Sequence, residues 1–153
     1  MFKNYQKNLK KNLTINYMIN NQIILFKFIQ TNNNVNLCEI SFYYKLSENF
    51  IRKFQDKVEW HFISEYQNLS ESFIREFKDK VYWIKISVHQ KLSESFIREF
   101  QDKVNWSAIS AYQKLSENFI IEFQDKVNWS EISCCQTLSE YFIKEFKHKL
   151  YGK

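Results

Sequence analysis

Residues 92–114 read LSESFIREFQDKVNWSAISAYQK, and nearly the same 23-residue string recurs along most of the chain. The tryptophans mark the step most clearly, since Trp60, Trp83, Trp106 and Trp129 stand 23 residues apart. A fixed period of this length is the signature of a tandem array, in which each unit covers the hydrophobic side of its neighbour. The sequence therefore bounds the architecture closely, whereas it identifies no biochemical activity.

The repeats divide the chain into two parts. Residues 1–36 form a basic, atypical N-terminal segment or cap, and residues 37–153 form the array. Within the array a degenerate unit precedes four complete units and one truncated unit, which are residues 46–68, 69–91, 92–114, 115–137 and 138–153. Burial of the apolar side chains of one such unit does not exceed the conformational entropy lost on folding, so each unit needs neighbours.

Each repeat is predicted to contain two short helices. Ser93 has the side chain of an N-cap, and Glu94 follows where the helix dipole favours an acid. Apolar residues at helical spacing then continue from Phe96 to Val104, which predicts a first helix of about 11 residues. Asn105 is placed to cap a second helix of about eight residues that begins at Trp106.

A single continuous helix does not fit the period. At about 3.6 residues per turn, the apolar face would rotate by about 140° from one repeat to the next, and no continuous seam would survive. The leucine-rich strand pattern L-x-x-L-x-L is also absent. We therefore predict an all-α fold, a short α-solenoid of stacked two-helix repeats in which the tryptophans belong to the core between repeats.

The positive charge of the chain comes from its N-terminal segment. Removing five N-terminal lysines from the 22 basic residues leaves 17, which equals the number of acidic residues, so the array itself is balanced. The segment is compatible with a solvated leader or with a basic arm that contacts nucleic acid. Residues 15–29 are compatible with a capping helix or with a hairpin about Asn20 and Asn21. The five lysines are Lys3, Lys7, Lys10, Lys11 and Lys27.

Three cysteines are too few, and odd in number, for a disulfide framework. Cys134 and Cys135 are compatible with a strained vicinal disulfide or a redox switch. They are also compatible with two reduced thiols at variable positions, and Cys38 is compatible with a reduced thiol as well. Together with the lack of a signal sequence, this favours a cytoplasmic protein. The apolar stretch 22–29 is too short to span a bilayer, so we predict no membrane partner. We expect a monomer.

The recurring polar residues give no catalytic constellation. No histidine is placed to activate the serines of the Leu-Ser-Glu triplets, and these serines recur because each first helix needs a cap. No Cys/His spacing resembles a zinc site, and there is no glycine-rich phosphate loop. We therefore predict no enzyme, no catalytic residue, no cofactor and no metal. The five serines are Ser47, Ser70, Ser93, Ser116 and Ser139.

Comparison of the repeats with one another separates fixed positions from positions that drift. Trp, Ile, Ser and Gln recur in the second helix, whereas three positions on its opposite side differ from unit to unit. Solenoids bind partners through such faces, although solvent-facing positions without a role drift in the same way. The candidate protein-contact residues are His61, Phe62, Glu65, Ile84, Lys85, Val88, Ser107, Ala108, Ala111, Ser130, Glu131 and Cys134.

The units HQKLSESFIREFQDKVNW (89–106) and YQKLSENFIIEFQDKVNW (112–129) resemble a repeat found in many copies in uncharacterised proteins of giant nucleocytoplasmic DNA viruses. The resemblance covers residues 37–153 and fails over 1–36. It departs in the last unit, where His148 and Leu150 stand in place of Asp and Val. It implies a viral origin and the host cytoplasm, and it carries over no catalytic residue.

These observations favour a non-enzymatic scaffold that contacts a protein partner through the variable face of the second helix. Two alternatives remain open. One is nucleic-acid association through the basic N-terminal arm. The other is a decaying member of a repeat family without a distinct role.

Overall fold

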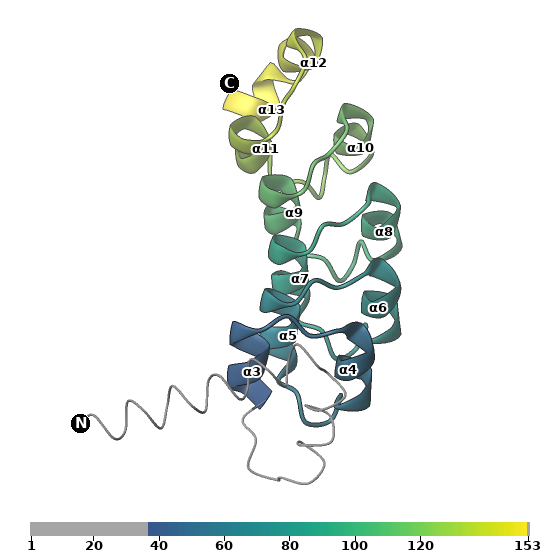
Figure 1. Ribbon diagram of the computed structural model, residues 1–153. Helices are drawn as coiled ribbons and strands as arrows, with labels where there is room; N and C mark the ends of the chain where they lie inside the picture. Colours follow the sequence, from purple (N-terminus) through teal and green to yellow (C-terminus); the bar gives the residue numbers. More distant parts are fainter. Residues whose placement is uncertain (1–36, 153) are drawn as a thin grey trace, which may run out of the picture. The chain divides into compact units, whose positions relative to one another are not determined.

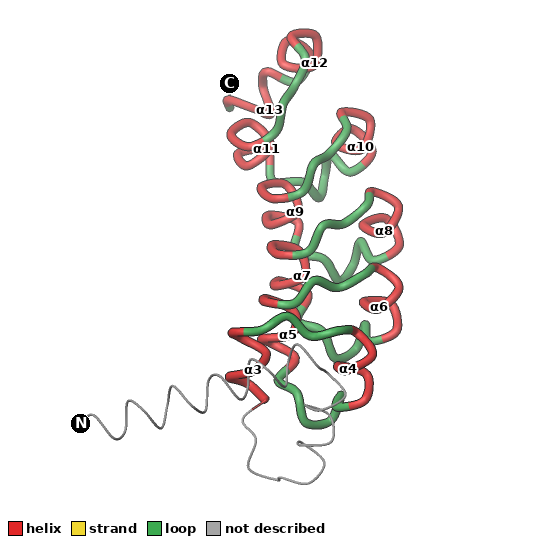
Figure 2. The backbone as a smooth tube through the Cα atoms, in the orientation of Figure 1, coloured by secondary structure: helices red, strands yellow, loops and turns green. Residues whose placement is uncertain are grey.

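The computed structural model describes residues 37–152, and that part of the chain consists of short helices joined by turns and loops, without strands (Figures 1 and 2). The even-numbered helices are α4 (Glu48–Lys53), α6 (Glu71–Glu76), α8 (Glu94–Glu99), α10 (Glu117–Glu122) and α12 (Glu140–Glu145). The odd-numbered helices are α3 (Leu37–Tyr43), α5 (Trp60–Tyr66), α7 (Trp83–His89), α9 (Trp106–Tyr112), α11 (Trp129–Cys135) and α13 (Lys147–Tyr151). The predicted all-α repeat architecture is confirmed.

Contacts divide the chain into two compact units, residues 1–63 and residues 64–153. In the first unit, the described core holds Phe50, Ile51 and Ile63. In the second unit, α7, α9 and α11 pack side by side in one row, and α13 packs on α11 and α12. Helices α6, α8 and α10 form a second row (Figure 1). The repeats 69–91, 92–114 and 115–137 therefore each contribute one helix to each row.

The first helix of each repeat, which belongs to the even-numbered row, is shorter than the sequence predicts. Helix α8 ends at Glu99, about half the expected length, and Phe100 leaves the helical region with φ −112° and ψ 29°. The chain then turns, held by hydrogen bonds from the N–H groups of Lys103 (2.9 Å) and Val104 (3.1 Å) to the carbonyl of Phe100. Because the turn keeps Phe96, Phe100 and Val104 four residues apart, its apolar spacing is the same as that of a helix.

The predicted caps are confirmed. The hydroxyl of Ser93 accepts a hydrogen bond from the N–H of Phe96 at 3.2 Å, and the other four triplet serines do the same in their repeats. In α9, the side chain of Asn105 accepts from the N–H of Ala108 at 2.9 Å. These bonds pair helix-start N–H groups that have no partner inside the helix.

The tryptophans pack between repeats, as predicted. The ring of Trp106 lies 5.0 Å from that of Phe123 and 6.2 Å from that of Phe119, both in the next repeat. Its indole N–H donates to the carbonyl of Gln101 at 2.9 Å, which ties the turn to the start of α9. Each tryptophan in the second unit is half-buried, with its ring against the following repeat. The fully buried side chains beside them are Phe96, Ile97, Ile109, Phe119, Ile120 and Ile132.

Candidate protein-contact surface

The twelve candidate residues lie on four odd-numbered helices, three on each of α5, α7, α9 and α11. Ile84, Ser107 and Ser130 occupy the second position of their helices and are exposed. Ile84 is 55% exposed, although each helix from α4 to α11 buries one isoleucine almost completely. This column forms the open part of the predicted face.

The next column is mostly covered. Ala108 is only 7% exposed, so the prediction that it faces solvent is wrong. Helix α9 packs between α7 and α11. Lys85 and Glu131, at the equivalent positions, are half-buried. In this column, the long side chains of Lys85 and Glu131 therefore reach the surface, whereas the short side chain of Ala108 does not.

Residues of the third column differ in exposure. Cys134 is exposed, whereas Val88, Ala111 and Glu65 are half-buried. His61 and Phe62, on the first turn of α5, are also half-buried. The accessible face in the second unit is consequently centred on α7 and α9, with the start and end of α11 beside it.

Two candidate residues pair with each other across repeats. The ammonium of Lys85 lies 2.7 Å from a carboxylate oxygen of Glu65. This hydrogen bond lowers the pKa of Glu65 below its ordinary value, against the opposing effect of burial. The side chain of Asn128 also donates to the hydroxyl of Ser107 at 3.1 Å. Part of the polar character of the face is therefore used inside the array.

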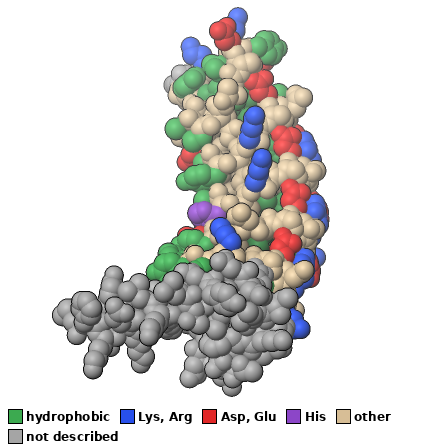
Figure 3. Space-filling view, in the orientation of Figure 1, with side chains coloured by type: hydrophobic (Ala, Val, Ile, Leu, Met, Phe, Trp, Pro, Cys, Tyr) green, Lys and Arg blue, Asp and Glu red, His purple; other side chains and the backbone are tan. Residues whose placement is uncertain are grey.

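Tyr112 is an exposed aromatic residue at the end of α9, and the sequence reasoning missed it. It is the last residue of α9 and is 65% exposed, directly after Ala111. Helix α9 carries no charged side chain at all. The available signal was the tyrosine at the last helical position of three units, Tyr43, Tyr66 and Tyr112. Hydrophobic side chains gather along the row of odd-numbered helices in the second unit, as Figure 3 shows.

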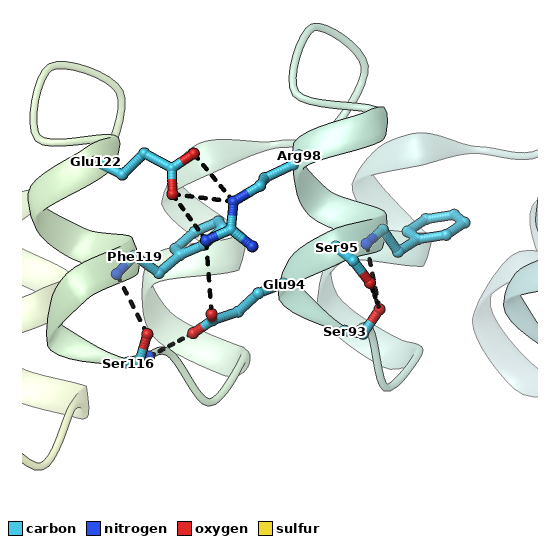
Figure 4. A network of polar contacts seen from close by, with 8 residues as sticks. Ser93, Glu94, Ser95, Arg98, Ser116, Phe119 and Glu122 are labelled. Atoms are coloured by element: carbon cyan, nitrogen blue, oxygen red, sulfur yellow. Dashed lines mark hydrogen bonds and ion pairs between the residues drawn. The ribbon is translucent and has the colours of Figure 1, made fainter.

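The opposite row carries most of the charge. The guanidinium of Arg98 on α8 donates to both carboxylate oxygens of Glu122 on α10, at 2.7 to 3.0 Å, and lies 4.9 Å from the centre of the Phe119 ring (Figure 4). The same hydrogen bonds lower the pKa of Glu122 from its ordinary value. Glu94 accepts from the N–H of Ser116 at 2.6 Å. Arg75 repeats the arrangement one unit earlier, with Glu99 at 2.7 Å.

A serine in the second helix of each repeat and a glutamine directly after that helix have a structural role. The sequence did not indicate this role. The hydroxyl of Ser87 donates to the carbonyl of Trp83 (2.7 Å) and accepts from the N–H of Asn105 in the next repeat (2.9 Å). Gln113 likewise bonds backbone groups one repeat earlier. Apart from Ser133 and Gln136, which are half-buried, these residues are buried, so they are not available to a ligand.

Cys134 and Cys135 are both free thiols on the exposed end of α11. The Cys135 thiol lies 3.7 Å from a carboxylate oxygen of Glu131. The pKa of Cys135 is raised, first by its hydrogen bond with Cys134 and then by burial and the nearby carboxylate. The interpretation as two reduced thiols agrees with this geometry, and a raised pKa keeps the thiol in its less reactive, protonated form.

Three absences apply to residues 37–152 alone. No group of three His, Cys, Asp or Glu side chains in that range is arranged to hold a metal ion. No helix there combines the length and apolar character that a bilayer crossing requires. The N-terminal predictions, which concern the basic arm, the capping helix or hairpin at 15–29, and the stretch 22–29, lie outside the described residues, as does the side chain of Cys38.

Comparison of the chain with family models, with curated proteins and with solved structures finds no match. The resemblance to the viral repeat therefore stays a prediction that rests on the quoted strings. What the fold defines is an all-helical tandem repeat protein.

Proposed function

We propose that the protein is a non-enzymatic scaffold that contacts another protein through the odd-numbered row of helices. The contact surface centres on Ile84 and Tyr112, with Ser107 and Val88 beside them. The observation that carries the proposal is the separation of side chains between the two rows. In the second unit, α7 and α9 expose Ile84 and Tyr112, while Arg75 and Arg98 on the other row pair with glutamates of the next repeat.

The chemistry of this surface favours a protein partner. Exposed aromatic and aliphatic side chains that lie among small polar ones are typical of the centre of a protein interface, where charged residues are depleted. The charges near the surface are few, and Lys85 and Glu65 neutralise each other. Nucleic acid binding depends on a surplus of positive charge, which this row does not offer.

The proposal also includes cytoplasmic localisation, a viral origin and a monomeric state. These rest on the cysteine usage and on the resemblance described above. Capture of partners from infected cells, combined with sedimentation of the purified chain, tests all three.

Paired substitutions of exposed residues test the contact surface. We expect Ile84→Asp with Tyr112→Asp to abolish capture of every partner that the wild-type chain retains, because a charge at an apolar contact must lose its hydration on binding. The matched control is Tyr141→Asp on α12, a residue that is also exposed but lies on the other row. It is expected to leave capture unchanged. Circular dichroism verifies that both variants fold.

The result that contradicts the proposal is an unchanged set of captured partners in the Ile84/Tyr112 variant. Loss of capture in the Tyr141 variant alone would move the contact surface to the even-numbered row.

A further inference from the structure

Arginine–glutamate ion pairs connect successive helices of the even-numbered row. This series of pairs, the arginine ladder, ends at Ile121. Arg75 on α6 pairs with Glu99 on α8, and Arg98 on α8 pairs with Glu122 on α10. At the next step the position of the arginine is taken by Ile121, which is 40% exposed. Its expected partner on α12, Glu145, is exposed and makes no ion pair within the described part of the chain. The α10–α12 joint therefore lacks the bridge that the two preceding joints have.

Two other contacts around the last unit are longer than their equivalents one repeat earlier, whereas the side-chain amide of Gln136 keeps its bonds to the Ser110 and Gln113 carbonyls at 2.8 Å. The N–H of Leu115 lies 3.2 Å from the side-chain amide oxygen of Gln136, whereas the equivalent distance from Leu92 to Gln113 is 3.0 Å. Gln136 is half-buried, while Gln113 is buried. The rings of Trp129 and Phe146 are 5.6 Å apart, against 5.0 Å for the equivalent pair one repeat earlier.

The last unit is still held by packing, since Phe142 and Leu150 are buried and α13 packs on α11, and by polar contacts. Lys149 donates to the side chain of Gln124 at 2.7 Å and lies 5.2 Å from the Trp129 ring. Glu117 accepts from both the N–H (2.5 Å) and the hydroxyl of Ser139 (3.1 Å). The contacts of Glu117 are exposed and contribute little to stability in water, whereas that of Lys149 is half-buried.

We propose that α12 and α13 form a unit that opens separately from the rest of the array, and that the isoleucine at position 121 sets this weak joint. In a tandem array the stability is a sum of unit terms and interface terms, so one weakened interface lowers the free energy of opening for everything beyond it. Opening would uncover the ring of Trp129, which packs on Phe142 and Phe146. The joint is thus a conformational device built into the repeat, independent of the proposed contact surface.

Amide hydrogen exchange tests the joint. The probes are the N–H groups of Ile143 and Phe146, which bond the carbonyls of Ser139 and Phe142 at 2.9 Å. Ile121→Arg restores the ladder, and we expect it to raise the protection of both probes by about two- to fivefold at low salt, the factor typical of an exposed ion pair. Protection in α8 should not change.

A second substitution isolates the cause. In the double variant Ile121→Arg with Glu145→Gln, the gain in protection is expected to disappear, because the new arginine has lost its carboxylate. The mirror variant Arg98→Ile should create a second weak joint and lower the protection of the Ile120 and Phe123 amides by a similar factor.

Two outcomes overturn the proposal. One is that Ile121→Arg leaves the exchange of Ile143 and Phe146 at the wild-type rate. The other is that the gain persists in the double variant, since the missing ion pair would then not be the cause. Because every variant changes an exposed side chain, the fold itself is not at risk.

Discussion

The side-chain amide of Gln113 hydrogen-bonds the backbone carbonyl of Gln90, the residue that occupies the same place one repeat earlier (2.8 Å). The same nitrogen also donates to the carbonyl of Ser87 at 2.9 Å, and the amide oxygen accepts from the N–H of Leu92 at 3.0 Å. One side chain thus pairs three backbone groups where the second helix ends and the loop begins. Because both helices are too short to be stable alone, such bonds fix how one repeat sits on the next.

Gln113→Ala is expected to destabilise the array by at least about 2 kcal/mol, because it leaves buried backbone groups without hydrogen-bond partners. The matched control is Gln136→Ala. Gln136 makes the same three contacts but is half-buried, so water can replace its bonds. Urea unfolding followed by circular dichroism should show a clearly smaller loss for the control. Equal losses of stability would mean that burial does not determine how much these hydrogen bonds contribute.

Trp106→Phe separates the indole hydrogen bond from the ring stacking. Phenylalanine keeps an aromatic ring against Phe123 but cannot donate to the carbonyl of Gln101. We expect a loss of about 1 kcal/mol in the free energy of unfolding, the usual net value of one hydrogen bond. Trp106→Ala should cost at least twice as much, since it also removes the packing between repeats. If the two variants are equally stable, the stacking contributes nothing.

Ser93→Ala tests the assignment of the triplet serine as a cap. The Ser93 hydroxyl accepts from the N–H of Phe96, and its removal should cost about 1 kcal/mol in thermal or urea unfolding. Ser95→Ala is the control, because Ser95 is exposed and bonds only the Ser93 hydroxyl. It should change stability by less than about 0.5 kcal/mol. A larger effect at Ser95 than at Ser93 would contradict the cap assignment.

The Arg98–Glu122 pair should make stability depend on pH in a defined direction. The pKa of Glu122 is lowered in the folded protein from its ordinary value of 4.5. A carboxyl whose pKa is lowered by folding contributes stability above its unfolded pKa and loses it as the pH falls through the folded pKa. Glu122→Gln should therefore be less stable than wild type at pH 7 and should match it below the folded pKa.

Salt provides a second check on the same pair. Because the side chains of Arg98 and Glu122 remain 40% and 45% exposed, 1 M NaCl should remove most of the difference between wild type and Glu122→Gln at pH 7. A difference that is unchanged by salt and by acid would mean that the glutamate acts through packing, not through its charge.

Much of the fold was accessible from the sequence because the repeat is so regular. The positions of Ser93 and Asn105 before apolar runs predicted both caps, and the 23-residue step predicted stacked helical pairs. The length of α8 was not accessible. A helix and the turn after Glu99 place Phe96, Phe100 and Val104 at the same intervals, so the apolar pattern does not show where the helix ends.

The exposure of the candidate residues was predicted only in part. Drift among repeats included Ala108, which is buried, and omitted Tyr112, which is exposed. Drift records which positions tolerate change. A short side chain at a crowded position and a long one at an open position can both vary without cost to the fold.

The sequence by itself determined the period, the helical class, the caps and the aromatic residues that must pack between units, because all of these depend on residue type and local spacing. Tertiary structure alone decided what each fixed polar residue bonds and which charges pair. Arg98 meets Glu122 at 24 residues' separation, and Gln113 meets Gln90 at 23, only because stacking brings neighbouring repeats side by side. Contacts of that kind depend on how two units dock, and the chain's local pattern does not encode their geometry.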